Sequence, residues 1–331
     1  MSTKKLLVVL GTLVLGAFIL AACAGPQGPA GPAGPQGPAG PQGPALTTAD
    51  LTCTQCHNDT TLITGKETAW ASSLHGSGTT VAYAGARAGC NGCHSGGGFT
   101  DRIASGTKTA DIKTADPNAS RIDCRACHNI HTTYTKDDFA LKTTAAVTLE
   151  SSGVTYDGGM GNLCANCHQP RTAFPAAKDG KVSVSSTHWG AHHGPVAAMI
   201  QGVGGAGAVV GKPSMHATTV KDTCVTCHLG EGAVHTFTPD VATCVTCHAD
   251  AKNLDVDGVQ TTITDKLAKV EEALKAKGLL DANGTIVVGD YPEAQAAALW
   301  NFLFVEEDKS LGVHNADYAN ALLDAALEAL K

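Results

Sequence analysis

The sequence is poor in the side chains from which a protein core is usually built. Aromatic residues make up only 5% of its 331 residues, and Met occurs four times. Between residues 51 and 250, Leu, Ile, Val and Phe account for 31 of 200 positions, below the ~20% at which composition alone indicates a chain that cannot fold. Much of the 43% hydrophobic content is Ala, Cys and an apolar N-terminus. Something other than side chains must therefore fill the core of this region.

The sequence also lacks a basic surface. Its formal net charge is −7, with 23 Lys and Arg against 30 Asp and Glu, and it contains no basic run with interleaved aromatic residues. Contacts of Lys and Arg with phosphates supply much of the affinity of nucleic-acid-binding proteins. We therefore expect no nucleic-acid partner.

The N-terminus has the features of an export signal. Lys4 and Lys5 precede an apolar run over residues 6–20, which is short for a membrane span. The run ends in Leu-Ala-Ala-Cys, which resembles the lipobox of bacterial lipoproteins, in which Cys23 carries the lipid. We expect a lipoprotein signal peptide over residues 1–22, export, and a lipid anchor in the outer membrane or at the cell surface. The alternative is a plain secretory signal in which Cys23 has no role.

A collagen-like repeat follows the signal. Residues 25–45 are seven uninterrupted Gly-Pro-Xaa triplets in which Xaa is Gln or Ala. At ~3.1 Å per residue, these 21 residues extend over roughly 65 Å. We expect a stiff stalk over residues 23–48. It either forms a homotrimer through a collagen triple helix or stands alone as a polyproline-like spacer.

After the stalk the pattern Cys-Xaa-Xaa-Cys-His occurs six times and uses every remaining cysteine; we number these motifs one to six in chain order. Two thiols at this spacing reach the two vinyl groups of one haem, and the adjacent imidazole becomes the proximal ligand of the iron. The sequence therefore predicts six haem c groups. The attachment positions are Cys53, Cys56, Cys90, Cys93, Cys124, Cys127, Cys164, Cys167, Cys224, Cys227, Cys244 and Cys247. The proximal histidines are His57, His94, His128, His168, His228 and His248.

Zinc, disulfides and dithiol redox chemistry are the alternatives for cysteines at this spacing. Zinc ribbons use paired Cys-Xaa-Xaa-Cys but do not require His after every second Cys. Disulfides are common in exported proteins, and a redox dithiol needs a thioredoxin-like strand and helix that are absent here. Six haems over residues 53–248 leave about 33 residues per haem. The porphyrins would then supply the missing apolar core, and haems this dense would lie close enough for electron hopping.

Eight histidines lie outside the six motifs, against four Met, so we expect histidine at the sixth position of most irons. The candidate distal ligands are His75, His131, His193, His216, His235 and His314, with His188 and His192 less favoured.

Three of these histidines belong to one cluster at residues 188–193, which we expect to supply one ligand. We favour His193 from the cluster and assign the other two as hydrogen-bond donors to a ligand or as a surface pair. His131 follows His128 too closely to bind the same iron and would serve a neighbouring haem. From its spacing alone, His314 is either a distal ligand or a solvent-facing residue at the start of the last helix.

Beyond residue 250 the composition changes to helical patterns. Apolar residues recur at helical spacing over residues 263–274, Pro292 is placed to begin a second helix, and Asn315 to cap a third. We expect a helical hairpin or bundle over residues 251–331, packed on a haem domain over residues 49–250. The fold class is mainly α with much irregular coil, a multihaem cytochrome c fold with a haem-packed core.

These residues resemble the exported multihaem c-type cytochromes of the nitrite reductase and hydroxylamine oxidoreductase superfamily, including hexahaem lipoprotein cytochromes of metal- and mineral-respiring bacteria. The resemblance runs from about Thr52 to the C-terminus. Besides the six motifs, the segments that carry it are residues 70–75, 124–131, 192–195, 234–239 and 308–315. It implies that the C-terminal helices bring in His314 as a distal ligand. No Cys-Xaa-Xaa-Cys-Lys motif is present, so the resemblance does not extend to the lysine-ligated haem of the ammonifying enzymes.

Together these features predict a lipid-anchored electron carrier without catalytic residues rather than an enzyme. It would pass electrons between a partner cytochrome and a periplasmic or extracellular acceptor, and its negative charge favours basic partners or cationic acceptors. One alternative is a reductase of a small nitrogen or sulfur oxyanion at a haem without a distal ligand, with a spare histidine of the 188–193 cluster as proton donor. The other is a subunit of a haem-bearing filament.

Overall fold

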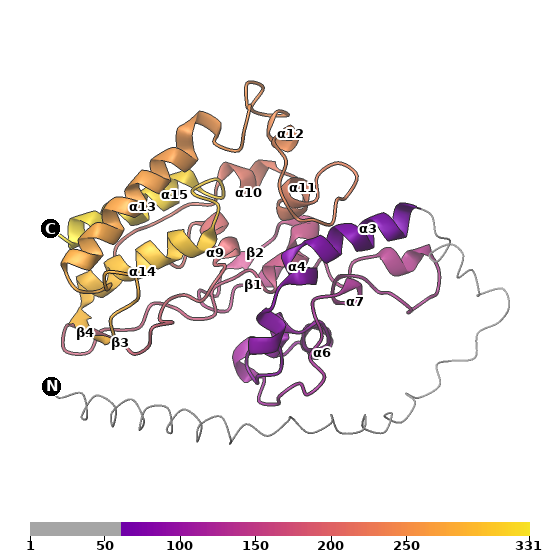
Figure 1. Ribbon diagram of the computed structural model, residues 1–331, viewed down its shortest axis with the longest axis horizontal. Helices are drawn as coiled ribbons and strands as arrows, with labels where there is room; N and C mark the ends of the chain where they lie inside the picture. The colour runs from indigo at the N-terminus through magenta and orange to yellow at the C-terminus, as the bar shows by residue number, and fades with distance from the viewer. Residues whose placement is uncertain (1–60) are drawn as a thin grey trace, which may run out of the picture. The chain divides into compact units, whose positions relative to one another are not determined.

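The structure, a computed structural model, describes residues 61–331, with side chains described from residue 63 (Figure 1). By its contacts the chain divides into two units, residues 1–46 and 47–331. The expected signal peptide, Cys23, the collagen-like stalk and motif one, with Cys53, Cys56 and His57, lie outside the described residues. These expectations stay predictions.

Helices predominate in the described residues, and most of those around the motifs are single turns. The two longer ones are α3 (Thr61–Ser72) and α6 (Gly96–Ser105). The short α-helices are α4 (Leu74–Ser77), α5 (Asn91–His94), α7 (Cys124–Cys127), α8 (Asn162–Ala165), α9 (Val196–Gln201), α10 (Met215–Thr219), α11 (Cys224–His228) and α12 (Val241–Cys244). A π-helical turn spans Val81–Gly85, and 3₁₀ turns span Thr109–Asp111, Lys136–Phe139, Gly159–Gly161 and Val256–Gly258. Helices this short are unstable alone, so they depend on what they pack against.

Sheet is limited, within the described part of the chain, to two antiparallel ladders of two strands. Strand β1 (Val147–Thr148) pairs with β2 (Thr155–Tyr156). Strand β3 (Lys181–Val184) pairs with β4 (Gly289–Pro292), with Val182 opposite Tyr291. Because β3 precedes motif five and β4 follows motif six, the second ladder joins the motif region to the C-terminal segment.

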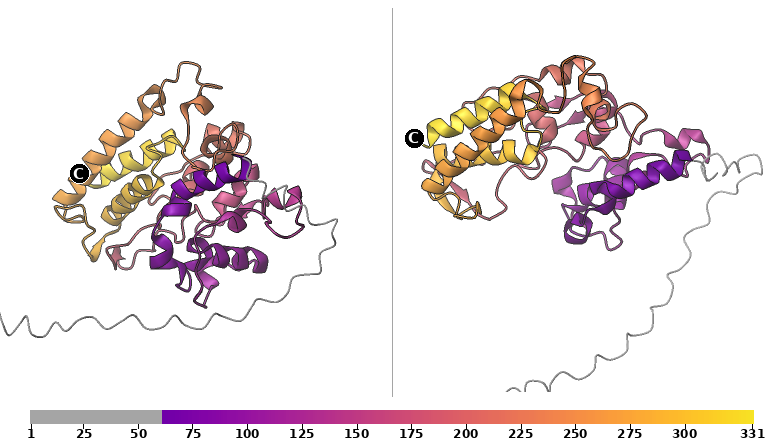
Figure 2. Two further views of the ribbon diagram at one scale, coloured as in Figure 1. Left: turned by 45° about the vertical axis from the view of Figure 1, so that its right-hand side comes forward. Right: turned by 45° about the horizontal axis from the view of Figure 1, so that its top comes forward.

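Three long helices occupy the C-terminal segment and pack on one another: α13 (Val259–Ala276), α14 (Glu293–Asp308) and α15 (Ala316–Ala329). They lie side by side in both further views (Figure 2). The apolar stripe predicted over residues 263–274 is the buried face of α13. Asn315 caps α15 as predicted, with its side chain accepting a hydrogen bond from the Tyr318 amide. Pro292 is the N-cap of α14 instead of its first residue, because it also ends β4.

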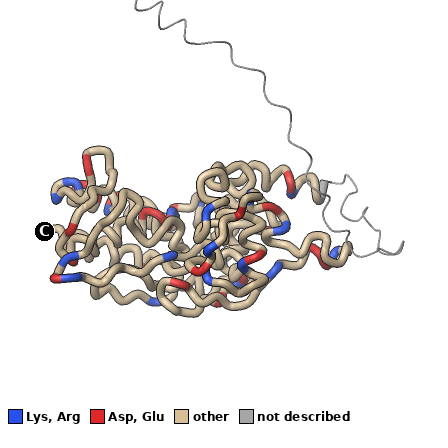
Figure 3. Tube along the Cα trace, turned by 90° about the horizontal axis from the view of Figure 1, so that it is seen from below, with Lys and Arg blue, Asp and Glu red and all other residues tan. Residues whose placement is uncertain are grey.

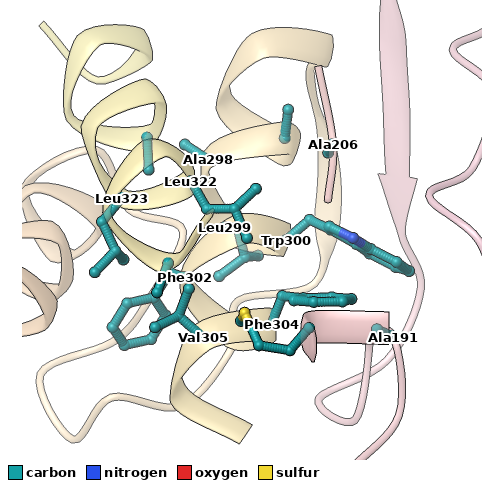
Figure 4. Close-up of a cluster of buried hydrophobic side chains, with 14 of the residues drawn as sticks. Ala191, Ala206, Ala298, Leu299, Trp300, Phe302, Phe304, Val305, Leu322 and Leu323 are labelled. Atoms are coloured by element: carbon teal, nitrogen blue, oxygen red, sulfur yellow. The ribbon is translucent and has the colours of Figure 1, made fainter. Parts of the chain in front are cut away.

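The larger hydrophobic core lies between these helices and the polypeptide around motifs four and five (Figure 4). Trp300 and Phe304 of α14 and Leu322 of α15 are buried in it together with Tyr156 and Met199. A second cluster, within the motif region, contains only three buried residues, Phe99, Ala126 and Leu163. Side-chain packing is therefore concentrated toward the C-terminal helices.

Acidic and basic residues are interspersed along the described part of the chain (Figure 3). Among the residues that the structure describes, no helix is both long and apolar enough to cross a bilayer.

Candidate haem-binding sites

Each described motif is folded as a helical turn that closes on its own histidine. The backbone N–H of His94 donates to the carbonyl of Cys90 at 3.0 Å, and that of His168 donates to the carbonyl of Cys164 at 2.9 Å. The same bond recurs in motifs three and six, at 2.9 and 2.8 Å. At 3.6 residues per turn, positions i, i+3 and i+4 share one face of a helix. Both thiols and the imidazole of a motif are therefore on one side, as attachment of a single planar group requires.

The histidines outside the motifs are held by separate local structures. His75 lies on α4, where the Ser73 hydroxyl accepts a hydrogen bond from the Gly76 amide at 3.3 Å. His216 lies on α10, which Ser214 caps in the same way through the Ala217 amide at 3.1 Å. The remaining ones are on loops or, for His314, just before α15. Serine caps of this kind stabilise turns that are too short to persist alone.

Five of these outside histidines each stand opposite a different motif histidine. The ring centroids are 6.0 Å apart for His94 and His192, 6.1 Å for His168 and His75, 6.2 Å for His128 and His235, 6.3 Å for His248 and His216, and 6.3 Å for His228 and His314.

The separation within each pair fits one metal ion between two imidazoles. An imidazole nitrogen binds a divalent metal at about 2.0 Å and lies about 1.1 Å from its ring centroid, so two imidazoles on opposite sides place their centroids about 6.2 Å apart. All five pairs lie within 0.2 Å of this value. Direct contact between two stacked rings allows shorter separations as well. The repetition of one distance at five sites therefore points to a common ligand geometry.

The cluster at residues 188–193 presents a different histidine from the one that the sequence favoured. His192, with φ 78°, faces His94, whereas His193 is exposed and its Nδ1 lies 2.7 Å from Oε2 of Glu307. His188 is also exposed. Consecutive side chains of an irregular chain point in different directions, so only one of the two adjacent histidines can face the motif. The structure thus pairs His192, and not the favoured His193, with His94. Which of the two binds iron stays a prediction.

His131 lies in the turn that follows motif three. Its backbone is in the left-handed region, with φ 62°. Its ring stacks on that of Tyr134, with centroids 5.5 Å apart.

In half of the ten paired imidazoles, the second ring nitrogen contacts the protein. Nδ1 contacts a backbone carbonyl in four of them: His128 with Phe139 at 2.7 Å, His216 with Val313 at 2.9 Å, His228 with Phe237 at 2.9 Å and His235 with Ala233 at 2.7 Å. Because a carbonyl oxygen only accepts, Nδ1 must carry the proton. Nε2 then keeps its lone pair, which is the arrangement of metal-binding histidines.

His314 differs from the other four because its Nδ1 partner is a carboxylate, Oδ1 of Asp308, at 2.8 Å. Burial lowers the pKa of His314, but the charge of Asp308 and its hydrogen bond outweigh burial, so the pKa is raised above its ordinary value. Asp308 also accepts a hydrogen bond from the Ser310 hydroxyl. The position of this carboxylate is therefore fixed at both oxygens.

Burial keeps the imidazoles of two pairs neutral. The ring of His168 lines a cavity, and its exposed surface faces that cavity. Burial in the surrounding protein, together with the nearby His75, lowers the pKa of His168 to about 4. Burial, Arg171 and His193 likewise lower the pKa of His192 to about 4. A neutral imidazole is the form that binds iron, so both rings are ready to act as ligands at neutral pH.

One continuous cavity of about 3080 Å³ connects the five pairs. All ten described motif cysteines and all five histidine pairs line it. Sites for one small ligand usually occupy about 300–1,000 Å³. The cavity is thus several times too large for a single cofactor and has the lining that several covalently attached porphyrins need.

Motif four lies in contact with three other motifs. The thiol of Cys167 is in hydrogen-bonding contact with that of Cys93 in motif two. The thiol of Cys164 makes the same contact with Cys224 in motif five. Cys127 of motif three packs with Cys167 on the small hydrophobic cluster. Helices α11 and α12 contact each other, which brings motif six next to motif five.

Several residues of these sites were missed in the sequence. Phe237 packs edge-on against His75, with centroids 4.7 Å apart, and contacts His235 at 5.9 Å, so one phenyl ring joins two pairs. Asp308 lies in the segment that carried the resemblance, but only its histidine attracted notice. Arg102 has no sequence signal at all, since a lone arginine near a motif is usually a surface residue.

Comparisons with known proteins show likeness to a cytochrome family and to multihaem cytochromes. The cytochrome c3 family matches residues 45–142, which contain motifs one to three. No curated protein matches the chain. Among solved structures, the chain is similar to the outer cell wall cytochrome OcwA, with a TM-score of 0.53 and 25% identity over 80% of this chain and 50% of that one.

The chain is also similar, with a TM-score of 0.45 and 20% identity, to an undecahaem cytochrome from the S-layer of Carboxydothermus ferrireducens, over 73% of this chain and 37% of that one. It spans half the length of OcwA. The cytochrome c3 match and the likeness to OcwA together support the assignment of this chain as a multihaem c-type cytochrome.

Proposed function

We propose that this chain is an exported electron carrier with six haem c groups, each attached through two thioethers and ligated by two histidines. The observation that carries the proposal is the set of five imidazole pairs with ring centroids 6.0–6.3 Å apart, each joining a motif histidine to one from elsewhere. When bound, haem supplies one-electron redox chemistry. The chain sets the ligands, burial and spacing of the haems.

The proposal assigns the outside histidines one to a site. His192, His235, His75, His314 and His216 serve motifs two to six in that order. His131 keeps the role that its spacing suggests, a candidate ligand of a neighbouring haem. Two histidines at each iron would leave no open position for a substrate, so these residues would support electron transfer rather than substrate binding at metal. This favours a carrier over the reductase alternative.

The connected arrangement of the motifs supports transfer through the whole protein. Motif four contacts motifs two, three and five, and motif five contacts motif six. Sites in such contact leave no room for an insulating layer of polypeptide between them. Electrons accepted at one site therefore reach the others by short steps.

Location and partners follow from the N-terminal sequence. OcwA is described as an outer cell wall cytochrome, and an exported or surface position agrees with the signal and lipobox ending at Cys23. The chain is proposed to be lipid-anchored, with the Gly-Pro-Xaa stalk as spacer or trimerisation element. Its partners are other redox proteins or an extracellular acceptor. Its relation to the nitrite reductase and hydroxylamine oxidoreductase superfamily remains a prediction.

The haem content and spin state of the purified, mature protein test the proposal. The pyridine haemochrome assay should give six haems per chain, and electron paramagnetic resonance should show low-spin iron only. A high-spin signal with turnover of nitrite, hydroxylamine or tetrathionate by a reduced dye would establish the reductase instead. The size of the delipidated protein should be measured with and without residues 24–45. A trimer that is lost when these residues are removed would show assembly through the stalk, and a larger assembly that persists without them would show a filament.

A further inference from the structure

A buried ion pair lies between motifs two and four. Nη1 of Arg102 is 3.6 Å from Oε1 of Glu150, and the two side chains are 5% and 13% exposed. Removing two charges from water costs several kcal/mol each, and their attraction alone does not reliably offset that cost. The pair therefore calls for an explanation beyond stability.

Arg102 connects the two motifs through their backbones. Its Nε donates to the carbonyl of Gly92 at 3.0 Å, and its Nη2 donates to the carbonyl of Asn166 at 2.8 Å. Gly92 lies between the two cysteines of motif two, and Asn166 between those of motif four. Because the guanidinium is a rigid planar fork, two such bonds fix the distance and orientation between the motif turns.

The side chain of Arg102 passes so close to Gly92 of motif two that no Cβ would fit between them. A Cβ at position 92 would lie 2.8 Å from Cδ of Arg102 and 2.5 Å from Cδ1 of Ile112. Glycine at this motif position is therefore what lets the guanidinium reach the carbonyl.

Glu150 ties the same ion pair to the surroundings of both motifs. Its Oε1 accepts hydrogen bonds from the amide and hydroxyl of Thr109, at 2.9 and 3.0 Å. Its own amide donates to Oε1 of Gln169 at 2.7 Å, and Gln169 follows the motif-four histidine directly. The carboxylate is thereby held in place on the side of Arg102 away from the motif carbonyls.

The ion pair is next to the point where the two motifs meet. The sulfur atoms of Cys93 and Cys167, the second cysteines of motifs two and four, lie next to each other there. A charge at this position acts on both sites at once. In a poorly hydrated environment it acts more strongly than the same charge at the surface.

We propose that Arg102 is a positioning residue that fixes the contact between the haem sites of motifs two and four and that its buried charge raises the midpoint potentials of both. A positive charge stabilises the reduced, less positive iron, so its removal lowers the potentials. The inference rests on the proposed function. It adds which two sites are coupled and which side chain couples them.

The test compares Arg102→Gln with Arg87→Gln in the mature holoprotein. Arg87 is exposed, lies over the ring of Tyr83 at 4.1 Å and precedes motif two by three residues, so the control removes the same charge near the same motif. In a spectroelectrochemical titration, Arg102→Gln should lower two of the six midpoint potentials and leave four unchanged. Arg87→Gln should move none. Equal titrations for Arg102→Gln and the wild type would overturn the proposal.

A double variant separates charge from structure. Arg102→Gln with Glu150→Gln removes both charges, so the two midpoint potentials should return toward the wild-type values. The bonds of Arg102 to both motifs are still lost in this variant. The magnetic coupling between the two haems, which depends on their distance and orientation, should therefore be reduced. Potentials that stay low in the double variant would show a structural effect only and would overturn the electrostatic part.

If Arg102→Gln does not load haem, Arg102→Lys takes its place. Lysine keeps the positive charge, so the two midpoint potentials should stay at their wild-type values. It cannot donate to the carbonyls of Gly92 and Asn166 in one fixed plane, so the magnetic coupling between the two haems should fall. Unchanged coupling would overturn the positioning role. A wild-type protein with fewer than six haems would contradict the proposed function itself, whereas six haems with unmoved potentials would contradict only this inference.

Discussion

Nδ1 of His314 lies 2.8 Å from Oδ1 of Asp308, and the Asp308 side chain is only 1% exposed. In the other four paired imidazoles with a described Nδ1 partner, that partner is a neutral carbonyl. A buried carboxylate makes the imidazole more basic and more electron-donating than a carbonyl does. The site of motif five, which faces His314, is thereby distinguished from its neighbours by one side chain.

Replacing Asp308 by Asn should raise one midpoint potential. With Asp308 as its partner, the His314 imidazole is more basic and stabilises oxidised iron. The neutral amide of the variant makes the imidazole less basic, so the reduced form becomes relatively more stable. A tenfold change in relative stability corresponds to about 60 mV for one electron. A spectroelectrochemical titration of the holoprotein measures the shift.

Glu307→Gln is the matched control for Asp308→Asn. It alters the adjacent residue, which pairs with Nδ1 of His193 at 2.7 Å, and none of the five histidine pairs contains His193. The control should leave all potentials in place. If both variants shift the midpoint potentials by the same amount, the cause is the loss of one negative charge. The hydrogen bond between Asp308 and His314 would then contribute nothing specific.

His192→Ala should convert one haem to the high-spin state, because it removes the imidazole whose centroid lies 6.0 Å from that of His94. His193→Ala should leave every haem low-spin, since that exposed side chain is paired with Glu307. Electron paramagnetic resonance of the oxidised proteins measures both. The reverse result would restore His193 as the ligand.

Asn315→Ala should loosen α15. The Asn315 amide donates to the carbonyls of Met199 at 3.1 Å and Lys212 at 2.9 Å, and its oxygen accepts from the Tyr318 amide at 3.2 Å. Loss of the cap and of buried donors should cost about 2–4 kcal/mol in local opening free energy. Hydrogen exchange of the α15 amides measures it.

Asn315→Ser is the informative companion, because its hydroxyl keeps a capping oxygen and adds no buried charge, while the bonds donated by the amide are lost. The α15 amides of this variant should exchange at rates between those of the wild type and Asn315→Ala. If Asn315→Ser exchanges as fast as Asn315→Ala, capping contributes little here, and the contacts with residues 199–212 hold the helix.

Without haem, the motif region should not fold. Its own hydrophobic cluster has three buried residues, and its helices at the motifs are of four or five residues. Helices α13 to α15 should keep part of their structure, because their side chains supply most of the larger core. Hydrogen exchange of chain produced without haem attachment measures the difference. Protected amides in α5, α7 and α8 of that protein would contradict the prediction.

The local features of this protein could be predicted from its sequence. A motif histidine is four residues from its first cysteine, so the helical turn alone places the thiols and the imidazole together. The helical stripe over residues 263–274 and the cap at Asn315 depend equally on neighbours in the chain. A low content of large apolar residues around the motifs likewise indicated a core completed by cofactors.

Tertiary structure alone decided which histidines meet. The partner of each motif histidine comes from a distant segment, and the choice between His192 and His193 depends on the backbone turn at one residue, with φ 78°. Arg102 with Glu150, and Asp308 with His314, are pairs formed by the path of the chain. The sequence by itself determined the predicted positions of haem attachment, because thioether attachment needs only local spacing. The pairing of the histidines and the charges around them came only from the folded chain, because those contacts join residues that no local rule relates.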